Sequence, residues 1–448
     1  MTLSRSATHV LAAIFLIAIL LRFPWLGLKS LWLDEAASVY YATPVFENVD
    51  SVHPPLYYVF VHYTMALLGR SEAAIRLPSA LFSILNVALL YWLGRKLFNR
   101  QVGLLAAALL AVSPLDIWYA QEARMYAAVA CATLCMALGL SWRHWAGFLL
   151  YFLGLLAGLH LIYFFAPIWL ALSALWLVNW QRRDGKPLHL VLWVAASAAA
   201  WAAFLPWLPQ LWRWIENTLG GHWILAPVRA LQGGSQLSPL HFGAIVAMVT
   251  ATLIVAALSM PTILRQRQWR RLITVLALAL FVGMILFVPL PRLYALKRIL
   301  YTSWALVVLC VAWLVLQLQQ RRGAVIGLLL GLSLASSLVA IFLVPKDDWR
   351  GVARAMQQQT PGAVLWVDPR WNNIVYRYYD PGREVLNESN ADIDTVAAQN
   401  AELWLVAERF HGRPAPSSPS EAWLDEHMVL QEVLPFYRLE LRRYHRPP

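Results

Sequence analysis

The sequence carries little charge for its length. Asp, Glu, Lys and Arg make up 13% of the 448 residues, whereas 60% of the residues are hydrophobic. A soluble globular domain carries about 25% charged residues, so the composition excludes an ordinary water-soluble protein. The open question is how many times the chain crosses a membrane.

Cysteine is nearly absent, and so are the spacings of metal sites. The 3 cysteines are Cys131, Cys135 and Cys310, each inside an apolar run. No CxxC pair and no Cys/His cluster with metal-site spacing occurs. Small buried side chains are the simplest interpretation of these cysteines. A repeat of about 20–50 residues, typical of solenoids and arrays, is also not visible.

Acidic residues are the scarcer charge, which leaves a formal net charge of +12. A basic excess can indicate nucleic-acid binding. Here the basic residues fall between apolar runs, as they do in cytoplasmic loops of membrane proteins, so no nucleic-acid partner is expected. Tryptophan is abundant, with 23 residues, and its ring favours the membrane–water interface. Membrane lipids are therefore predicted partners.

About eleven apolar runs are long enough to cross roughly 30 Å of hydrocarbon as helices. They lie near residues 7–26, 74–95, 102–118, 124–142, 145–161, 163–180, 188–207, 241–262, 271–289, 297–317 and 323–344. The first run could mimic a signal peptide. It is followed by Arg22-Phe23-Pro24-Trp25 rather than by a small-residue cleavage site, so we interpret it as a retained span.

The loops between these runs alternate in charge. One set is basic and holds Arg95, Lys96, Arg100, Arg143, Arg182, Arg183, Lys186, Arg265, Arg267, Arg270, Arg271, Arg321 and Arg322. The other set holds most of the acids, namely Asp34, Glu35, Glu47, Asp50, Glu72, Asp116, Glu122 and Glu216. The positive-inside rule places the basic set in the cytoplasm. We therefore expect a cytoplasmic N-terminus and a periplasmic or extracellular C-terminal domain, in a bacterial inner (plasma) membrane.

Residues 1–345 form the predicted transmembrane domain, with two long outward loops. The first loop, 27–73, contains amphipathic stretches at 31–42 and 56–68, which predict helices lying in the interface. The second, 208–240, is rich in glycine and is expected to be mobile.

After Pro345 the composition becomes polar and mixed. Residues 346–448 predict a small soluble α/β domain on the outer side, with a helix opening near Lys346 and buried strands at 363–367 and 403–407. The predicted fold class is an α-helical polytopic membrane protein with a small C-terminal α/β extracytoplasmic domain.

Ionisable groups on the outward face are the candidates for chemistry, because charges that enter a membrane bundle are costly and tend to be functional. The candidates are Asp34, Glu35, His53, Tyr57, Arg76, Glu122, Arg124, Tyr126, Arg292, Lys297 and Arg298. Plainer interpretations stay open. Asp34 or Ser30 could cap the interface helix, and Glu122 could sit in the first turn of a span. The basic residues from 292 to 298 could anchor the interface.

Several stretches resemble the polytopic glycosyltransferases of the GT-C superfamily, in particular the protein-mannosyltransferase and aminoarabinose-transferase group (glycosyltransferase family 39-like). They are Leu33-Asp34-Glu35-Ala36, His53-Pro54-Pro55-Leu56-Tyr57-Tyr58, Arg76-Leu77-Pro78-Ser79 and Tyr119-Ala120-Gln121-Glu122-Ala123-Arg124-Met125-Tyr126. Looser matches are Lys297-Arg298-Ile299-Leu300-Tyr301 and Asp347-Asp348-Trp349-Arg350. His53 departs from the pattern, since several relatives carry an acidic residue or Lys before the double Pro.

This resemblance implies an inverting transfer, at the outer face, from a polyprenyl-phosphate-linked sugar to an acceptor hydroxyl of a glycan, lipid or protein. It also implies Asp34 as the general base, because a carboxylate can take the proton of the acceptor hydroxyl. The phosphate leaving group needs charge stabilisation, for which Arg124, Arg292, Lys297 and Arg298 are candidates.

The remaining candidates receive supporting roles. Glu122 is the second catalytic candidate and would orient the acceptor, tune Asp34 or hold Arg124. The further substrate-binding candidates are Glu35, His53, Tyr57, Arg76 and Tyr126.

Two other functional classes stay open. A transporter or flippase of lipid-linked sugars needs ionisable groups near the midplane, whereas the mid-span segments here are almost free of charge. A non-catalytic scaffold or polymerase subunit is the other class. A divalent cation between Asp34, Glu122 and His53 is an alternative without a metal-spacing motif, so no cofactor and no metal ligand is firmly predicted. The residues identify neither the sugar nor the acceptor.

Overall fold

The computed structural model describes residues 5–43, 53–142, 144–163, 165–183, 185–213, 294–317, 322–359, 363–409 and 418–447. Up to residue 342 the described elements are helical. They are α1 (Arg5–Arg22), α2 (Leu33–Tyr41), α3 (Leu56–Leu68), α4 (Glu72–Leu97), α5 (Arg100–Ala111), α6 (Pro114–Ala120), α7 (Tyr126–Ser141), α8 (Trp145–Leu161), α9 (Phe165–Arg183), α10 (Pro187–Phe204), α15 (Tyr294–Gln317) and α16 (Arg322–Phe342). Helices occupy every predicted span that falls on described residues. The predicted spans 241–262 and 271–289, and most of the glycine-rich loop 208–240, lie outside them.

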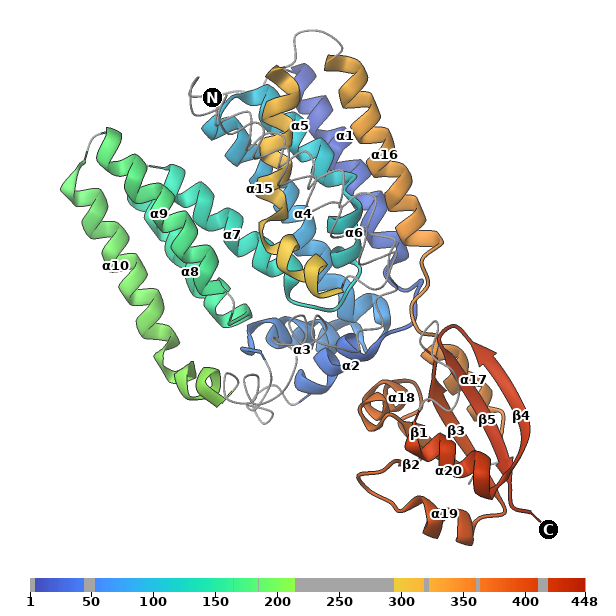
Figure 1. The fold of residues 1–448 in the computed structure, drawn as a ribbon. Helices are drawn as coiled ribbons and strands as arrows, with labels where there is room; N and C mark the ends of the chain where they lie inside the picture. Colours follow the sequence, from blue (N-terminus) through green and yellow to red (C-terminus); the bar gives the residue numbers. More distant parts are fainter. Residues whose placement is uncertain are drawn as a thin grey trace, which may run out of the picture.

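Two groups of helices stand side by side (Figure 1). One group contains α1, α4, α5, α6, α15 and α16, and the other contains α7 to α10. Helix α7 joins the groups because it packs against both α4 and α8. Helices α2 and α3 lie across one end of the bundle, as expected for the two amphipathic stretches of the first loop.

Glycines let neighbouring helices approach closely. A Cβ atom on Gly103 of α5 would lie 2.6 Å from the carbonyl oxygen of Tyr91 in α4. A Cβ on Gly139 of α7 would lie 2.5 Å from the carbonyl oxygen of Gly147 in α8. Such small-residue contacts are typical of helix pairs inside membranes, where close backbone packing replaces the hydrophobic effect.

Several described helices have the length and composition of membrane spans. Four pass on their own, namely Thr8–Trp25, Glu72–Leu97, Pro187–Arg213 and Arg322–Phe342. Helices α5 and α6 pass together as a fifth, bent by 58° at a break. Pro114 begins α6 and lacks the N–H needed to continue a helical ladder. Other apolar helices in the described ranges are shorter. The chain is a multi-pass membrane protein, and the predicted number of about eleven spans stays a prediction.

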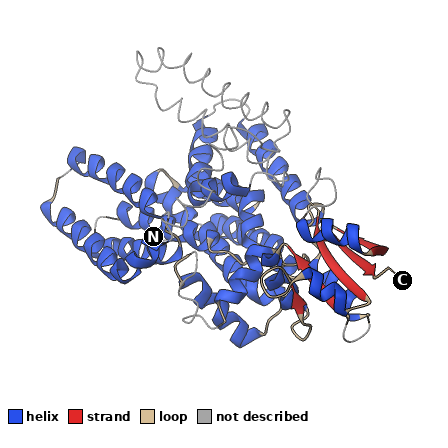
Figure 2. Cartoon of the chain, turned by 60° about the horizontal axis from the view of Figure 1, so that its bottom comes forward, coloured by secondary structure: helices blue, strands red, loops and turns tan. Residues whose placement is uncertain are grey.

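Within the described ranges, the strands are confined to the C-terminal part of the chain (Figure 2). Its elements are α17 (Trp349–Gln357), β1 (Val364–Asp368), α18 (Asn373–Tyr379), β2 (Val385–Leu386), α19 (Ile393–Gln399), β3 (Glu402–Glu408), α20 (Pro419–His427), β4 (Val429–Phe436) and β5 (Leu439–His445). The sheet has the order β2-β1-β3-β5-β4. Strands β2, β1 and β3 run parallel, and β5 and β4 continue the sheet antiparallel. The predicted buried strands at 363–367 and 403–407 are confirmed as β1 and β3.

Alternate residues of β3 face opposite sides of the sheet, as the two-residue period of a strand requires. Trp404 and Val406 join a core with α17 and α18. Leu403, Leu405 and Ala407 join a second core with α19 and α20. Between Glu402 and Glu408 the central strand is therefore apolar on both faces, which explains why the sequence revealed it.

The α/β part packs against the first long loop. Leu33 and Ala36 of α2 belong to the same apolar cluster as α17 and α18. The Arg350 guanidinium lies 2.7 Å from the Glu72 carboxylate, and the backbone N–H of Leu31 donates to the Tyr379 hydroxyl at 2.6 Å. The first loop and the α/β part thus share one end of the bundle (Figure 1), and their predicted placement outside the cytoplasm stays a prediction.

Candidate active site

Asp34 and Glu35 lie in the first turn of α2. The helix begins at Leu33, and its N-cap residue, Trp32, makes no side-chain capping bond. The Ser30 hydroxyl instead accepts a hydrogen bond from the backbone N–H of Arg350 at 3.1 Å. The interpretation of Asp34 or Ser30 as a helix cap is therefore wrong. Successive helical residues point about 100° apart, so the two carboxylates reach different surroundings.

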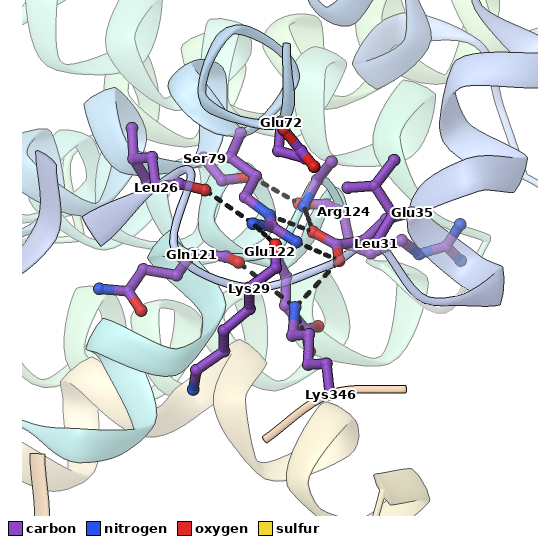
Figure 3. A network of polar contacts seen from close by, with 12 residues as sticks. Leu26, Lys29, Leu31, Glu35, Glu72, Ser79, Gln121, Glu122, Arg124 and Lys346 are labelled. Carbon is purple, nitrogen blue, oxygen red and sulfur yellow. Dashed lines mark hydrogen bonds and ion pairs between the residues drawn. The ribbon is translucent and has the colours of Figure 1, made fainter. Parts of the chain in front are cut away.

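Glu35 is fully buried and forms a two-pronged ion pair with Arg76 of α4 (Figure 3). Nε and Nη2 of Arg76 donate to Oε1 and Oε2 at 2.7 and 2.8 Å. The backbone N–H of Ala123 adds a bond to Oε1 at 2.9 Å. The Lys346 ammonium lies 3.0 Å from Oε2.

These partners decide the charge of Glu35. Burial alone raises the pKa of a carboxyl group. The nearby charges of Arg76 and Lys346, with the hydrogen bonds from Arg76 and Ala123, outweigh burial and lower the pKa of Glu35 to about 2. The residue is ionised at neutral pH.

Arg76 also organises the loop before α2. Nη1 donates to the carbonyl oxygens of Leu26 and Lys29 at 2.6 and 2.8 Å, and Nη2 donates to that of Ser30 at 3.1 Å. The guanidinium therefore ties α4 to the segment that precedes Asp34. The geometry of Glu35 and Arg76 favours positioning this loop over direct contact with a substrate.

Arg124 is a buried cation in contact with the segment that carries the predicted base. Its Nη1 lies 3.3 Å from the backbone oxygen of Asp34 and 3.4 Å from the Ser38 hydroxyl. Burial lowers the pKa of the Arg124 guanidinium, but the negative charge of Asp34 helps to raise this pKa above its ordinary value. Asp34 itself is half-buried. A carboxylate that can meet solvent or substrate thus lies beside a buried positive charge.

His53 lies on the opposite side of the same guanidinium. Its Nε2 is 3.0 Å from Nη2 of Arg124. Arginine can only donate, so Nε2 is the acceptor and the ring proton sits on Nδ1. The structure thus brings together three sequence candidates, Asp34, His53 and Arg124, which are far apart in the chain.

The tyrosines of α3 have different roles. The Tyr57 hydroxyl is bonded to the Ser79 hydroxyl at 2.7 Å, and Ser79 in turn donates to the backbone oxygen of Arg124 at 3.0 Å. Tyr57 therefore helps to hold the Arg124 backbone in place through Ser79. The neighbouring Tyr58 is also buried, but among the described residues its hydroxyl has no hydrogen-bond partner. Burial raises the pKa of this hydroxyl, and the charges of Arg124 and Asp34 also influence it. Tyr58 is therefore a candidate that the sequence did not single out.

Tyr126 opens α7 and completes the surroundings of Arg124. Its side chain hydrogen-bonds to the guanidinium, and its ring lies edge-on to Tyr119 at 5.0 Å between centroids. The ring is almost fully buried. Tyr126 therefore helps to fix the direction in which Arg124 points.

Glu122 lies in the same loop as Arg124, but its carboxylate lies near a different cation, Lys346. Its carboxylate is buried and lies 3.7 Å from the Lys346 ammonium. It precedes α7 and is not in the wet first turn of that helix. It lines a cavity of about 240 Å³ between the bundle and the α/β part. The two predicted catalytic residues thus belong to adjacent clusters, joined by Glu35, which accepts from the backbone N–H of Ala123. Figure 3 shows Glu35, Glu122 and Lys346 of this network.

Lys346 is the residue that sequence reasoning missed. It pairs with both Glu35 and Glu122 and also lies 5.7 Å from the Trp118 ring centroid. Lys29 lies over the same ring at 4.9 Å. Burial, followed by the charges of Lys346 and Arg76, lowers the pKa of Lys29 to about 7. The one available signal was the position of Lys346, directly after the last span.

A second buried ion pair lies deeper in the bundle. Nη2 of Arg22 is 2.7 Å from Asp116, which also accepts from the Tyr301 hydroxyl at 2.7 Å. This pair links α1, α6 and α15. Asp116, which the sequence placed among outward loop acids, is therefore an internal tie of the bundle.

Three of the basic candidates lie outside the described part of the chain, namely Arg292 and the side chains of Lys297 and Arg298. Among the described residues, no three His, Cys, Asp or Glu side chains gather closely enough to hold a metal ion. Between Asp34 and His53 the structure places the Arg124 guanidinium, which supplies positive charge there.

Comparisons with known proteins bear on this arrangement. Residues 52–210 match the sequence profile of the dolichyl-phosphate-mannose-protein mannosyltransferase family. The ArnT structure from Cupriavidus metallidurans in the apo state superposes with a TM-score of 0.50 at 16% identity, over 98% of each chain. The resemblance to the GT-C glycosyltransferases is confirmed. The chain has the GT-C fold, and the family match indicates a glycosyltransferase.

Two further solved structures are similar to this GT-C chain. ArnT from Cupriavidus metallidurans bound to undecaprenyl phosphate has a TM-score of 0.48 at 15% identity, over 98% of each chain. The Archaeoglobus fulgidus oligosaccharyltransferase in complex with Zn and sulfate has a TM-score of 0.45 at 13% identity, over 88% of this chain and 67% of that one. No protein of curated function matches the sequence.

Proposed function

We propose that this GT-C protein transfers a sugar from a polyprenyl-phosphate donor to an acceptor hydroxyl, with inversion at the anomeric carbon. The observation that carries the proposal is the buried Arg124 guanidinium beside the half-buried Asp34. The matching family is named for a lipid-phosphate-linked mannose donor, which is consistent with a phosphate leaving group.

Arg124 suits the departing phosphate. Guanidinium groups bind phosphate through charge-assisted hydrogen bonds. Among the described residues, Nε of Arg124 is buried without a hydrogen-bond partner, so a phosphate oxygen could accept from it. Positive charge that is already in place stabilises the negative charge that develops on the leaving oxygen.

Asp34 suits the role of general base. An acceptor hydroxyl becomes a better nucleophile when a carboxylate removes its proton as the new bond forms. Glu35 is held by Arg76, Lys346 and Ala123, so Asp34 is the carboxylate of the pair that can meet a substrate. Glu35 and Arg76 then position the helix that carries the base.

We further propose that the reaction takes place outside the cytoplasm of a bacterium, in its inner membrane. This rests on the basic loops, which predict a cytoplasmic N-terminus and a periplasmic domain over residues 346–448. Protease added to spheroplasts should remove residues 346–448 from the wild-type chain. Protection of this part until the membrane is permeabilised would reverse the orientation.

The function is tested with purified protein and radiolabelled polyprenyl-phosphate sugars, using mannose, aminoarabinose and pentose donors in parallel. Wild-type protein should release or transfer the sugar from at least one donor. Asp34→Asn should abolish transfer while the protein still inserts and folds, because the amide cannot take a proton. Asp394→Asn, in the exposed first turn of α19, is the matched control and should behave like wild type.

Two results would contradict the proposal. Full turnover by Asp34→Asn would remove the base from the mechanism. Movement of an intact donor across a liposome membrane, without cleavage of its sugar–phosphate bond, would identify a flippase instead.

A further inference from the structure

A cavity of about 240 Å³ lies between the membrane bundle and the α/β part. The bundle contributes Trp32, Trp118 and Glu122 to its wall, and the α/β part contributes Trp371, Asn372 and Glu408. Leu33 also lines it and directly precedes Asp34 in α2. The helical turn that carries the proposed base thus borders the cavity, whereas Asp34 and Arg124 themselves do not line it.

Trp371 is unusual for the α/β part. The tryptophans at 349, 366 and 404 are buried in the cores of that part, whereas Trp371 is 54% exposed. It belongs to a short helical turn, Arg370–Asn372, directly after β1. When an apolar surface covers an exposed indole at the mouth of a cavity, the water on the indole is released, which is favourable. Its position favours contact with a ligand over a role in folding.

The polar groups of the cavity are mainly acceptors. Glu122, Asp347 and Glu408 contribute three carboxylates, against the two cations Lys346 and Arg438. Both cations are paired: Lys346 lies 3.0 Å from Glu35 and 3.7 Å from Glu122, and Arg438 lies 3.2 Å from Asp347. Each carboxylate oxygen has more than one lone pair, so Glu122 and Asp347 can still accept further hydrogen bonds. The net charge of the lining disfavours a phosphate. Carboxylates that can accept hydrogen bonds instead suit hydroxyl or amino groups.

This combination matches the chemistry of a sugar ring, which presents an apolar C–H face and a rim of hydroxyl groups. The tryptophans of the lining offer apolar surface to that face, and the carboxylates with Asn372 can accept and donate at the rim. The volume is below the roughly 300–1,000 Å³ of pockets for drug-sized ligands. The cavity therefore has room for one saccharide ring rather than for a folded peptide segment.

We propose that this cavity is an acceptor subsite that binds a monosaccharide unit, with Trp371 as its stacking platform. The acceptor is then a glycan or a glycolipid. This inference rests on the proposed transferase function, whose acceptor it specifies. Glu122 forms part of the same wall and orients the bound ring toward the loop that carries Arg124.

The subsite is tested on the full-length protein in lipid nanodiscs by saturation-transfer NMR. The probes are methyl α-mannoside, methyl β-glucoside, methyl β-glucosaminide and a blocked serine tripeptide. At least one glycoside should bind, and Trp371→Ala should raise its Kd at least ten-fold. Trp423→Ala is the matched control, because Trp423 stacks on His427 of α20 at 4.4 Å and does not line the cavity. It should leave binding unchanged, and Trp371→Tyr should retain most of the affinity.

Three results would overturn the subsite. They are the absence of binding by every glycoside, equal binding by wild type and Trp371→Ala, and displacement of the glycoside by the tripeptide. Donor cleavage is measured in the same preparations. Loss of glycoside binding in Trp371→Ala with normal donor cleavage supports the subsite. Absence of donor cleavage in wild type counts against the transferase function, whatever the glycosides do.

Discussion

Replacing Glu35 by Gln should destabilise the protein substantially, because it removes the negative charge that two buried cations share. The side chains of Glu35 and Arg76 are 0% and 1% exposed, so water cannot replace the missing charge. Lys346, whose side chain is 7% exposed, loses the same partner. Glutamine has almost the same shape and can still accept from Ala123, so the substitution tests charge rather than packing.

The size of the effect follows from the pKa of Glu35. A fall from 4.5 to about 2 corresponds to roughly 3 kcal/mol, at about 1.36 kcal/mol per pH unit. Breaking one partner of a buried ion pair costs about 3–5 kcal/mol, which agrees. Because the pKa is lowered on folding, the stabilisation is complete above the unfolded value of 4.5 and disappears as the pH falls toward 2.

The measurement is a thermal melt of detergent-purified protein between pH 3 and pH 8. Glu35→Gln should melt well below wild type at neutral pH, and the difference should shrink as the pH falls below about 4.5. Glu388→Gln is the matched control, because the side chains of its ion pair with Arg370 are 52% and 58% exposed and the pair should contribute about 0–1 kcal/mol. Equal melting of wild type and Glu35→Gln at neutral pH would refute the reasoning.

Three further outcomes are expected. Lys29→Met should raise the melting temperature, most strongly below pH 7. Burial lowers the pKa of Lys29 from 10.5 to about 7, so the folded protein bears the full free-energy cost of the buried charge only below pH 7. A variant less stable than wild type at pH 6 would contradict this. Gly103→Ala should destabilise the α4–α5 contact, where a Cβ would meet a carbonyl oxygen at 2.6 Å, whereas Gly327→Ala in α16, with nothing within 4 Å, should not; equal melting of both would show that the helices can separate freely. Arg124→Gln should raise the KM for the radiolabelled donor at least ten-fold and leave the KM for the acceptor unchanged, and an equal rise in both would argue against a phosphate role.

The sequence predicted those features that depend on residues close together in the chain. Spans are visible as long apolar runs, and β1 and β3 are visible because both faces of each strand are buried. Strand β4 was not predicted, since it lies at the sheet edge with alternating exposed residues and includes Glu432. Its conformation depends on pairing with β5 more than on its own composition.

The site was predictable only in part, because several of its contacts join residues that are far apart in the chain. Asp34, His53 and Arg124 were singled out from motifs, and the structure brings them together. Lys346 reaches Glu35 across 311 positions of the chain, and no local pattern reveals a contact of that range. Adjacent carboxylates also look alike in a sequence, whereas on a helix one is buried against Arg76 and the other is not.

The bond between Lys346 and Glu35 has a consequence for biogenesis. Glu35 and Arg76 are both synthesised early, so their pairing can form while later spans are still being made. Lys346 emerges only after α16, the last described helix of the bundle. The second countercharge on Glu35 therefore arrives at the end of membrane insertion, and so does the contact of Lys346 with Glu122. A nascent chain holds an incomplete charge cluster, and the proposed active site reaches its final electrostatic state only when the last helix is in place.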